Sequence, residues 1–172
     1  MMAKSGGVNV KDLENFKRQI TNTLGANHID LFIESCAKEL AARLLAKVIK
    51  RTPVGDYSGG SYSCAGGKTH KGSKVPGKVG GTLRRGWTGA KSQAASAYAS
   101  NLKINHFGDV YVIEIINPIE YASYVEFGHR TKNRTGWVEG HFMLTISEQE
   151  IEADAPRILT NKLKKMLGEC FR

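Results

Sequence analysis

The sequence predicts an α+β fold, and three observations support this. Helical periodicity of apolar residues runs through residues 29–50 and returns over residues 142–171. Between these stretches, residues 109–116 are rich in β-branched side chains, which is typical of a strand. We therefore expect N-terminal helices, a small antiparallel β-sheet, a C-terminal helix packed on the sheet, and a long basic, glycine-rich loop.

A single domain over residues 1–172 is expected, because a chain of this length can bury a substantial core. We divide it into a helical part at 8–51, a basic Gly/Lys-rich insertion loop at 55–91, and a sheet with the C-terminal helix at 92–172. The three cysteines have no framework spacing and predict reduced thiols. No export signal and no membrane-spanning run are evident, so we expect no membrane partner.

Two helices are expected before the loop. The first covers residues 10–24, where apolar side chains recur at helical spacing until Gly25. The second, residues 29–50, carries a broad apolar stripe with charged residues on the opposite face. Pro53 ends it, because the residue before a proline is disfavoured in the α conformation.

The loop differs in composition from the rest of the chain. Residues 55–91 hold eleven of the nineteen glycines, and residues 55–92 hold seven basic residues and one acidic residue. Such a segment buries too little apolar surface to fold alone, and its charge attracts polyanions or acidic protein surfaces. Its tail, residues 80–87, regains apolar side chains and is expected to return to the fold as a strand. The expected loop contacts are Lys68, Lys71, Lys74 and Lys78.

The second half of the chain predicts strands followed by a helix. Residues 98–106 and 109–116 are expected to form an antiparallel hairpin. Residues 119–127 predict a helical turn or a short helix. In the C-terminal stretch, 142–171, the helical pattern is interrupted by Pro156, so we expect a kink or two consecutive helices.

Motifs for catalysis are incomplete. Gly67, Lys68 and Thr69 match the end of a phosphate-binding loop, but Tyr62 stands where its first glycine is required. The five histidines lack metal-ligand spacing, and no nucleophile motif is present. We therefore predict no enzyme, no catalytic residue, no cofactor and no metal site.

Residues 119–131 concentrate aromatic side chains around the Glu126 carboxylate. Its apolar members are interpreted as packing on the sheet: Tyr121, Tyr124, Val125 and Phe127. Gly128 is expected to end a helix in the left-handed conformation. Alternatively, the Glu126 carboxylate, which is costly to bury unpaired, pairs with Arg84 or Arg85 in this subunit or a neighbour.

Several motifs together resemble the tail-completion, or head–tail joining, proteins of long-tailed bacteriophages. They are Thr-Pro-Val at 52–54, Gly-Thr-Leu-Arg-Arg-Gly-Trp at 81–87 and Tyr-Ala-Ser-Tyr-Val-Glu-Phe-Gly at 121–128, within a resemblance that spans residues 28–170. The stretch Gly136–Leu144 is similar to the branch found beside contractile-tail genes. The chain departs from the family pattern by the insertion at 56–80, which separates the first two motifs.

The resemblance implies a structural protein of the virion neck, assembled in the bacterial host cytoplasm, with no catalysis. Such subunits form a ring, expected to be a hexamer, that completes or terminates the tail tube and joins it to the head connector. The implied partners are further copies of the chain, tail-tube and head-connector proteins, and DNA in the lumen. Interface candidates are Arg84, Arg85, Trp87, Tyr121, Tyr124, Glu126, Phe127, Gly128, His129, Arg130 and Trp137.

Closed rings use unlike complementary patches, and the chain offers a basic segment at 55–92 and an acidic one at 148–154. The acids Glu148, Glu150, Glu152 and Asp154 predict a solvated patch. On this interpretation, Glu126→Ala is expected to impair tail completion more than folding. The alternatives are a basic nucleic-acid-binding accessory protein that uses the 55–91 loop, and a small nuclease or NTP-driven enzyme.

Overall fold

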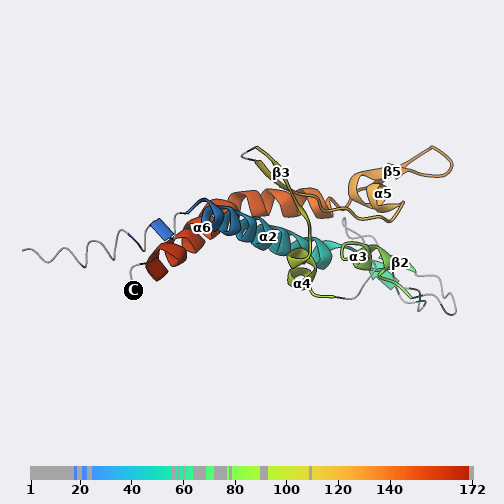
Figure 1. Ribbon diagram of the computed structural model, residues 1–172. Coiled ribbons are helices and arrows are strands. Elements are labelled where there is room, and N and C mark those ends of the chain that lie inside the picture. Colours follow the sequence, from blue (N-terminus) through green and yellow to red (C-terminus); the bar gives the residue numbers. More distant parts are fainter. Residues whose placement is uncertain are drawn as a thin grey trace, which may run out of the picture.

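Two long helices form the body of the molecule and pack side by side (Figure 1). They are α2 (Ala26–Arg51) and α6 (Met143–Cys170). The computed structural model describes residues 18, 21–22, 25–55, 57, 59, 61–63, 69–71, 77, 79–89, 93–108 and 110–170, so most of the first expected helix lies outside the described residues. No helix in this part of the chain is long and apolar enough to cross a membrane.

Antiparallel hairpins accompany the helices, which confirms the predicted α+β class. Their strands are β1 (Ser61–Ser63) with β2 (Thr69–Lys71), β3 (Ile104–Phe107) with β4 (Val110–Ile113), and β5 (Gly128–Arg130) with β6 (Trp137–Glu139). Among the described residues these are three separate two-stranded sheets, whereas one small sheet was expected. The β3–β4 hairpin was predicted, although both of its strands are shorter than expected.

Two segments predicted as strands are helical instead. Helix α4 (Ala95–Ser100) replaces the start of the first predicted strand, because alternate alanines there favour a helix. Helix α3 (Thr82–Gly86) replaces the strand expected at the end of the loop. A strand would have placed Arg85 on the same face as Leu83 and Trp87, whereas the helix buries the two apolar side chains and leaves the arginine half-buried.

The core lies along one face of α2. Leu45 and Val48 of this helix are fully buried, and the short helices α3 and α4 and the start of α6 pack around them. The buried cluster consists of Ala41, Leu45, Val48, Leu83, Trp87, Ala99 and Met143. The α2 face therefore positions every other helix described here, including α5 (Ala122–Phe127), whose Ala122 and Val125 pack against the same cluster.

Helix α6 packs mainly along α2, so its principal partner is a helix and not the sheet face that the sequence suggested. It is one continuous helix, which excludes the expected alternative of two consecutive helices. Pro156 lies in its interior on the exposed side. There the missing N–H leaves the carbonyl four residues earlier without its helical hydrogen bond.

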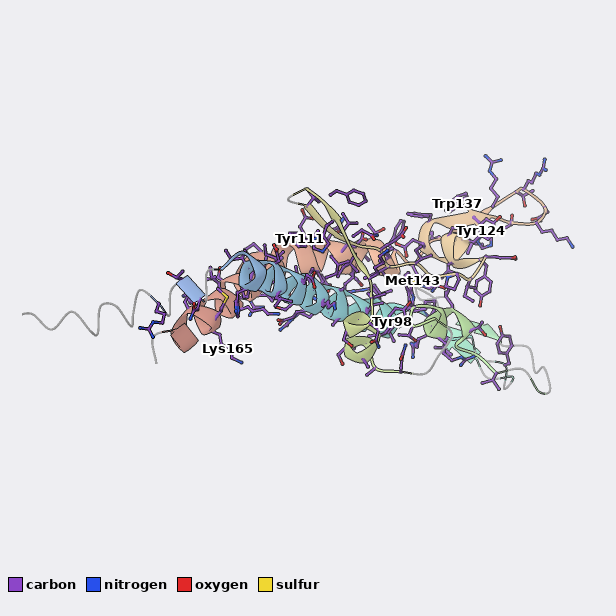
Figure 2. The ribbon with its side chains drawn as sticks, viewed as in Figure 1. Tyr98, Tyr111, Tyr124, Trp137, Met143 and Lys165 are labelled. Atoms are coloured by element: carbon purple, nitrogen blue, oxygen red, sulfur yellow. The ribbon has the colours of Figure 1, made fainter. Side chains whose placement is uncertain are left out.

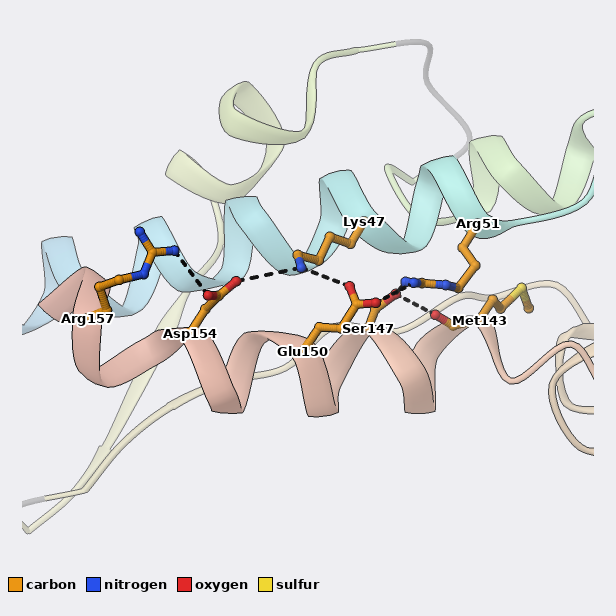
Figure 3. Close-up of polar contacts among 7 residues, drawn as sticks. All are labelled: Lys47, Arg51, Met143, Ser147, Glu150, Asp154 and Arg157. Atoms are coloured by element: carbon orange, nitrogen blue, oxygen red, sulfur yellow. Dashed lines mark hydrogen bonds and ion pairs between the residues drawn. The ribbon is translucent and has the colours of Figure 1, made fainter.

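Ion pairs fix the antiparallel register of α2 and α6 (Figure 3). Lys47 Nζ lies 2.8 Å from a Glu150 carboxylate oxygen, and Arg51 Nη2 lies 2.6 Å from the other. Further along the helix pair, Lys162 Nζ of α6 lies 3.0 Å from a Glu39 carboxylate oxygen in the middle of α2. Half of the predicted acidic patch is thus used within the subunit, since Asp154 also pairs with Arg157 at 3.0 Å.

These ion pairs predict a defined pH dependence of stability. Hydrogen bonds from Lys47 and Arg51 hold the pKa of Glu150 below its usual value of 4.5. A carboxylate whose pKa is lowered in the folded state contributes stability above its unfolded pKa and loses it as pH falls. On acidification below about pH 4.5, we therefore expect the free energy of unfolding to fall less for the Glu150→Gln variant than for the parent chain.

Urea unfolding at pH 7 and at pH 3.5 measures this difference. The matched control is Glu148→Gln, which removes an exposed carboxylate two residues away on the same helix. If both variants show the same pH dependence, the α2–α6 ion pairs do not contribute as described.

Candidate interaction surface

The first two sequence motifs meet at the end of α2. The Thr52 hydroxyl donates to the Val48 carbonyl at 2.7 Å and accepts from Trp87 Nε1 at 2.8 Å. The Thr52 carbonyl accepts from Arg84 Nη2 at 2.7 Å and from Arg84 Nε at 3.2 Å. Because Thr52 and Trp87 are both buried, this junction locks α3 onto the end of α2.

The insertion between these motifs leaves and re-enters the fold at one point. A Cβ added to Gly80 would overlap the carbonyl oxygen of Gly55, so the two backbones are in direct contact. Gly81 follows with φ +91°, a conformation that favours glycine. The Gly80 carbonyl also accepts from Arg85 Nη1 at 3.2 Å. The contact between Gly55 and Gly80 and the hydrogen bond from Arg85 therefore hold the two ends of the insertion together.

Removal of the insertion is expected to leave the fold intact. We predict that replacing residues 56–79 with Gly-Ser keeps the helical circular dichroism signal, because Gly55 and Gly80 already touch. Shortening the loop should raise the free energy of unfolding by up to about 2 kcal/mol through loop-closure entropy. Thermal and urea unfolding measure this. Gly80→Ala in the full chain is the contrasting variant, which should destabilise. An unfolded deletion variant would show that the insertion belongs to the core.

The third motif surrounds a buried carboxylate. The side chain of Glu126, at the end of α5, is 5% exposed. Its oxygens accept from the backbone N–H groups of Leu144 and Thr145 at 2.9 Å each and from the Thr145 hydroxyl at 2.8 Å. These donors belong to the first turn of α6, whose N–H groups have no partner within the helix. Glu126 therefore caps α6 from a neighbouring element.

The expected pairing of Glu126 with an arginine of the same chain is wrong. Arg84 is bound to the Thr52 carbonyl and Arg85 to the Gly80 carbonyl. A helix N-terminus offers aligned N–H donors and a partial positive charge, so it stabilises a carboxylate without a cation. Spacing in the sequence could not reveal this partner, because 18 residues separate Glu126 from Leu144.

Two glycines allow the segments around Glu126 to pack closely. Gly128 ends α5 with the predicted positive φ, +84°, but its ψ of 174° lies outside the left-handed helical region. A Cβ added to Gly140 would overlap the carbonyl oxygen of Glu126. The N–H groups of His141 and Phe142 donate to the carbonyls of Val125 and Glu126 at 2.8 and 3.0 Å. Residues 121–144 thus form one unit, which we call the capping unit.

The capping unit exposes large apolar side chains, most of them aromatic. Tyr124, Phe127 and Trp137 are 59%, 61% and 59% exposed, and Figure 2 shows Tyr124 and Trp137 at the same end of the molecule. We use the name aromatic surface for the exposed apolar residues of this unit, which are Tyr121, Tyr124, Phe127, Trp137, Val138 and Phe142; Trp137 and Val138 are neighbours in β6 and lie on its opposite faces. The His129 ring lies against Tyr124, with 5.7 Å between the ring centroids. Exposed apolar side chains gathered on one unit are typical of an interaction site.

The structure separates the predicted interface residues into exposed and buried groups. Trp87, at 3% exposure, and Glu126 are core residues that cannot contact a partner directly in this structure. Arg84 and Arg85 are half-buried, while Arg130 is exposed beside the aromatic surface. Sequence reasoning did not select Val138 and Phe142, although both belong to the Gly136–Leu144 motif. The side chains of Lys68, Lys71, Lys74 and Lys78 lie outside the described residues.

Among the described residues, no group of three or more potential metal ligands gathers. Thr69 begins strand β2, which is antiparallel to β1, so the Gly-Lys-Thr sequence leads into a strand. A phosphate-binding loop would open a helix at that position.

Comparison with known proteins matches the chain to a family of bacteriophage proteins. A family model described as "Bacteriophage HK97-gp10, putative tail-component" matches residues 14–128. This range contains all three motifs, and its last residue, Gly128, is also the last residue of the third motif. No curated protein and no solved structure matches the chain.

Proposed function

The chain belongs to the HK97-gp10-like family of bacteriophage tail components, and from this premise we propose that it forms a ring that completes the tail tube. The ring would join the tube to the head connector in the virion neck. We propose that the ring contains six copies around a lumen through which DNA passes. The contractile-tail branch is proposed on the Gly136–Leu144 motif alone, because the family match ends at residue 128.

The observation that best supports a structural role is the aromatic surface. Aromatic side chains are enriched among the residues that contribute most to protein–protein binding. Burying one large apolar side chain contributes about 1.5–3 kcal/mol, so several on one unit can support a stable contact.

Rigidity of the capping unit favours the same role. Glu126 and the backbone bonds from His141 and Phe142 fix α5 to the start of α6. A surface that is already ordered loses little conformational entropy on binding. The aromatic surface therefore suits a permanent contact in a particle that assembles once.

Negative-stain imaging of the purified protein, alone and with tails that lack it, tests this proposal. We expect closed rings in the first sample and a ring at one end of the tail tube in the second. A protein that stays monomeric at every concentration and never associates with tails would contradict it.

A further inference from the structure

We propose that neighbouring copies meet through two unlike surfaces, the aromatic surface of one copy and the outer face of the β3–β4 hairpin of the next. This inference rests on the proposed ring and names the surfaces that build it. Figure 2 shows Tyr111 of the hairpin well away from Tyr124 and Trp137, so one chain presents both surfaces at separate places.

The β3–β4 hairpin has one face on the subunit. His106 and Tyr111 are paired across the strands, and both contact α2. The Tyr111 hydroxyl donates to an Asp30 carboxylate oxygen at 2.6 Å, and His106 Nε2 lies 3.2 Å from a Glu34 carboxylate oxygen. These contacts anchor the inner face of the hairpin to α2.

The outer face of the hairpin is apolar as well. Its residues alternate with the anchored ones, and Phe107, Val110 and Val112 are 68%, 58% and 39% exposed. A hairpin with one face in water normally carries polar residues on that face. Apolar residues on both faces are typical of strands that are covered on both sides. The outer face is therefore suited to a partner.

Both hairpins are also incomplete as sheets. No third strand pairs with β3–β4 or with β5–β6 among the described residues. A two-stranded hairpin is marginally stable by itself, and its edges present N–H and C=O groups to a further strand. Contact between the two hairpins of neighbouring copies would cover apolar side chains and edges together.

The charges favour contact between two unlike surfaces of neighbouring copies over contact between two aromatic surfaces. The β5–β6 hairpin carries three exposed cations, Arg130 at the end of β5 and Lys132 and Arg134 in the turn. Two aromatic surfaces that faced each other would bring these cations together. The β3–β4 hairpin has mainly carboxylates around it instead, from Asp30 and Glu34 on α2, which contact its inner face, and from Glu114 after β4, with one exposed lysine, Lys103, before β3. Opposite charges thus favour a head-to-tail contact, which closes into a ring when the rotation permits.

Paired variants that each damage one surface test this geometry. Variant A carries Phe107→Asp and Val110→Asp, and variant B carries Phe127→Asp and Trp137→Asp. Each variant alone is expected to be monomeric, with at least about a 100-fold weaker self-association. An equimolar mixture is expected to form a one-to-one dimer and nothing larger, because only one intact pair of surfaces remains. Native mass spectrometry identifies the species.

Control variants separate folding from assembly. Leu163→Asp changes an exposed leucine at the far end of α6 and should assemble like the parent chain. If circular dichroism shows that variant A or B is unfolded, milder substitutions replace the aspartates. These are glutamine at Phe107, Phe127 and Trp137, and threonine at Val110.

The outcomes distinguish this inference from the ring itself. If variant A assembles like the parent chain, or the mixture stays monomeric while the parent forms rings, the surfaces are wrong and the proposed function stands. If the parent chain never assembles, the ring and this inference both fail.

Discussion

Replacing Glu126 with alanine is expected to lower the free energy of unfolding by about 2–4 kcal/mol, a fall of about 5–15 °C in Tm. The substitution removes the acceptor of two backbone N–H groups and one hydroxyl at the start of α6. These donors lie in a part-buried site, where an unsatisfied donor is destabilising. Thermal unfolding by circular dichroism measures the change.

A matched control distinguishes capping from a general effect of charge. Glu120→Ala removes an exposed carboxylate from the same segment and should change stability by less than about 0.5 kcal/mol. Glu126→Gln keeps acceptor capacity without the charge and should fall between the two. The sequence alone suggested that Glu126→Ala impairs tail completion more than folding, whereas the burial of Glu126 leads us to predict a large effect on folding as well. Equal stability of both alanine variants would contradict the capping role.

Replacing Trp87 with alanine is expected to cost about 3–5 kcal/mol of stability. This side chain is buried in the core between α2 and α3, and its Nε1 donates to the Thr52 hydroxyl at 2.8 Å. The substitution leaves a cavity and removes the link between the first two motifs. Urea unfolding followed by circular dichroism measures the loss.

The other tryptophan, Trp137, provides the control for the Trp87→Ala variant. Trp137 is 59% exposed on the aromatic surface, so Trp137→Ala should change subunit stability by less than about 0.5 kcal/mol. It should weaken self-association instead. If Trp137→Ala destabilises the isolated subunit as much as Trp87→Ala does, the assignment of one tryptophan to the core and the other to the interface is wrong.

Elements with strong local patterns were predictable from the sequence. The apolar stripe of α2 and the periodic C-terminal residues gave both long helices, because each pattern repeats over many turns. The short α5 and the β3–β4 hairpin were also predicted. In these cases the local residue pattern and the tertiary contacts favour the same structure.

Elements that depend on distant contacts were not predictable. The segment of α3 is too short for its composition to decide between a strand and a helix, and the helix places Leu83 and Trp87 in the buried cluster on α2. The ion pairs of Glu150 could not be predicted, because they form only when α6 packs along α2 and not on a sheet. The hydrogen-bond donors to Glu126 are backbone N–H groups at the start of a helix, and no residue type in the sequence marks such groups.

Native mass spectrometry of the intact chain over a range of concentrations tests the central claim most directly. Unlike surfaces that close into a ring predict one discrete oligomer, with a mass of six subunits, in equilibrium with the monomer. A monomer at all concentrations, or an open-ended ladder of oligomers, would contradict the account.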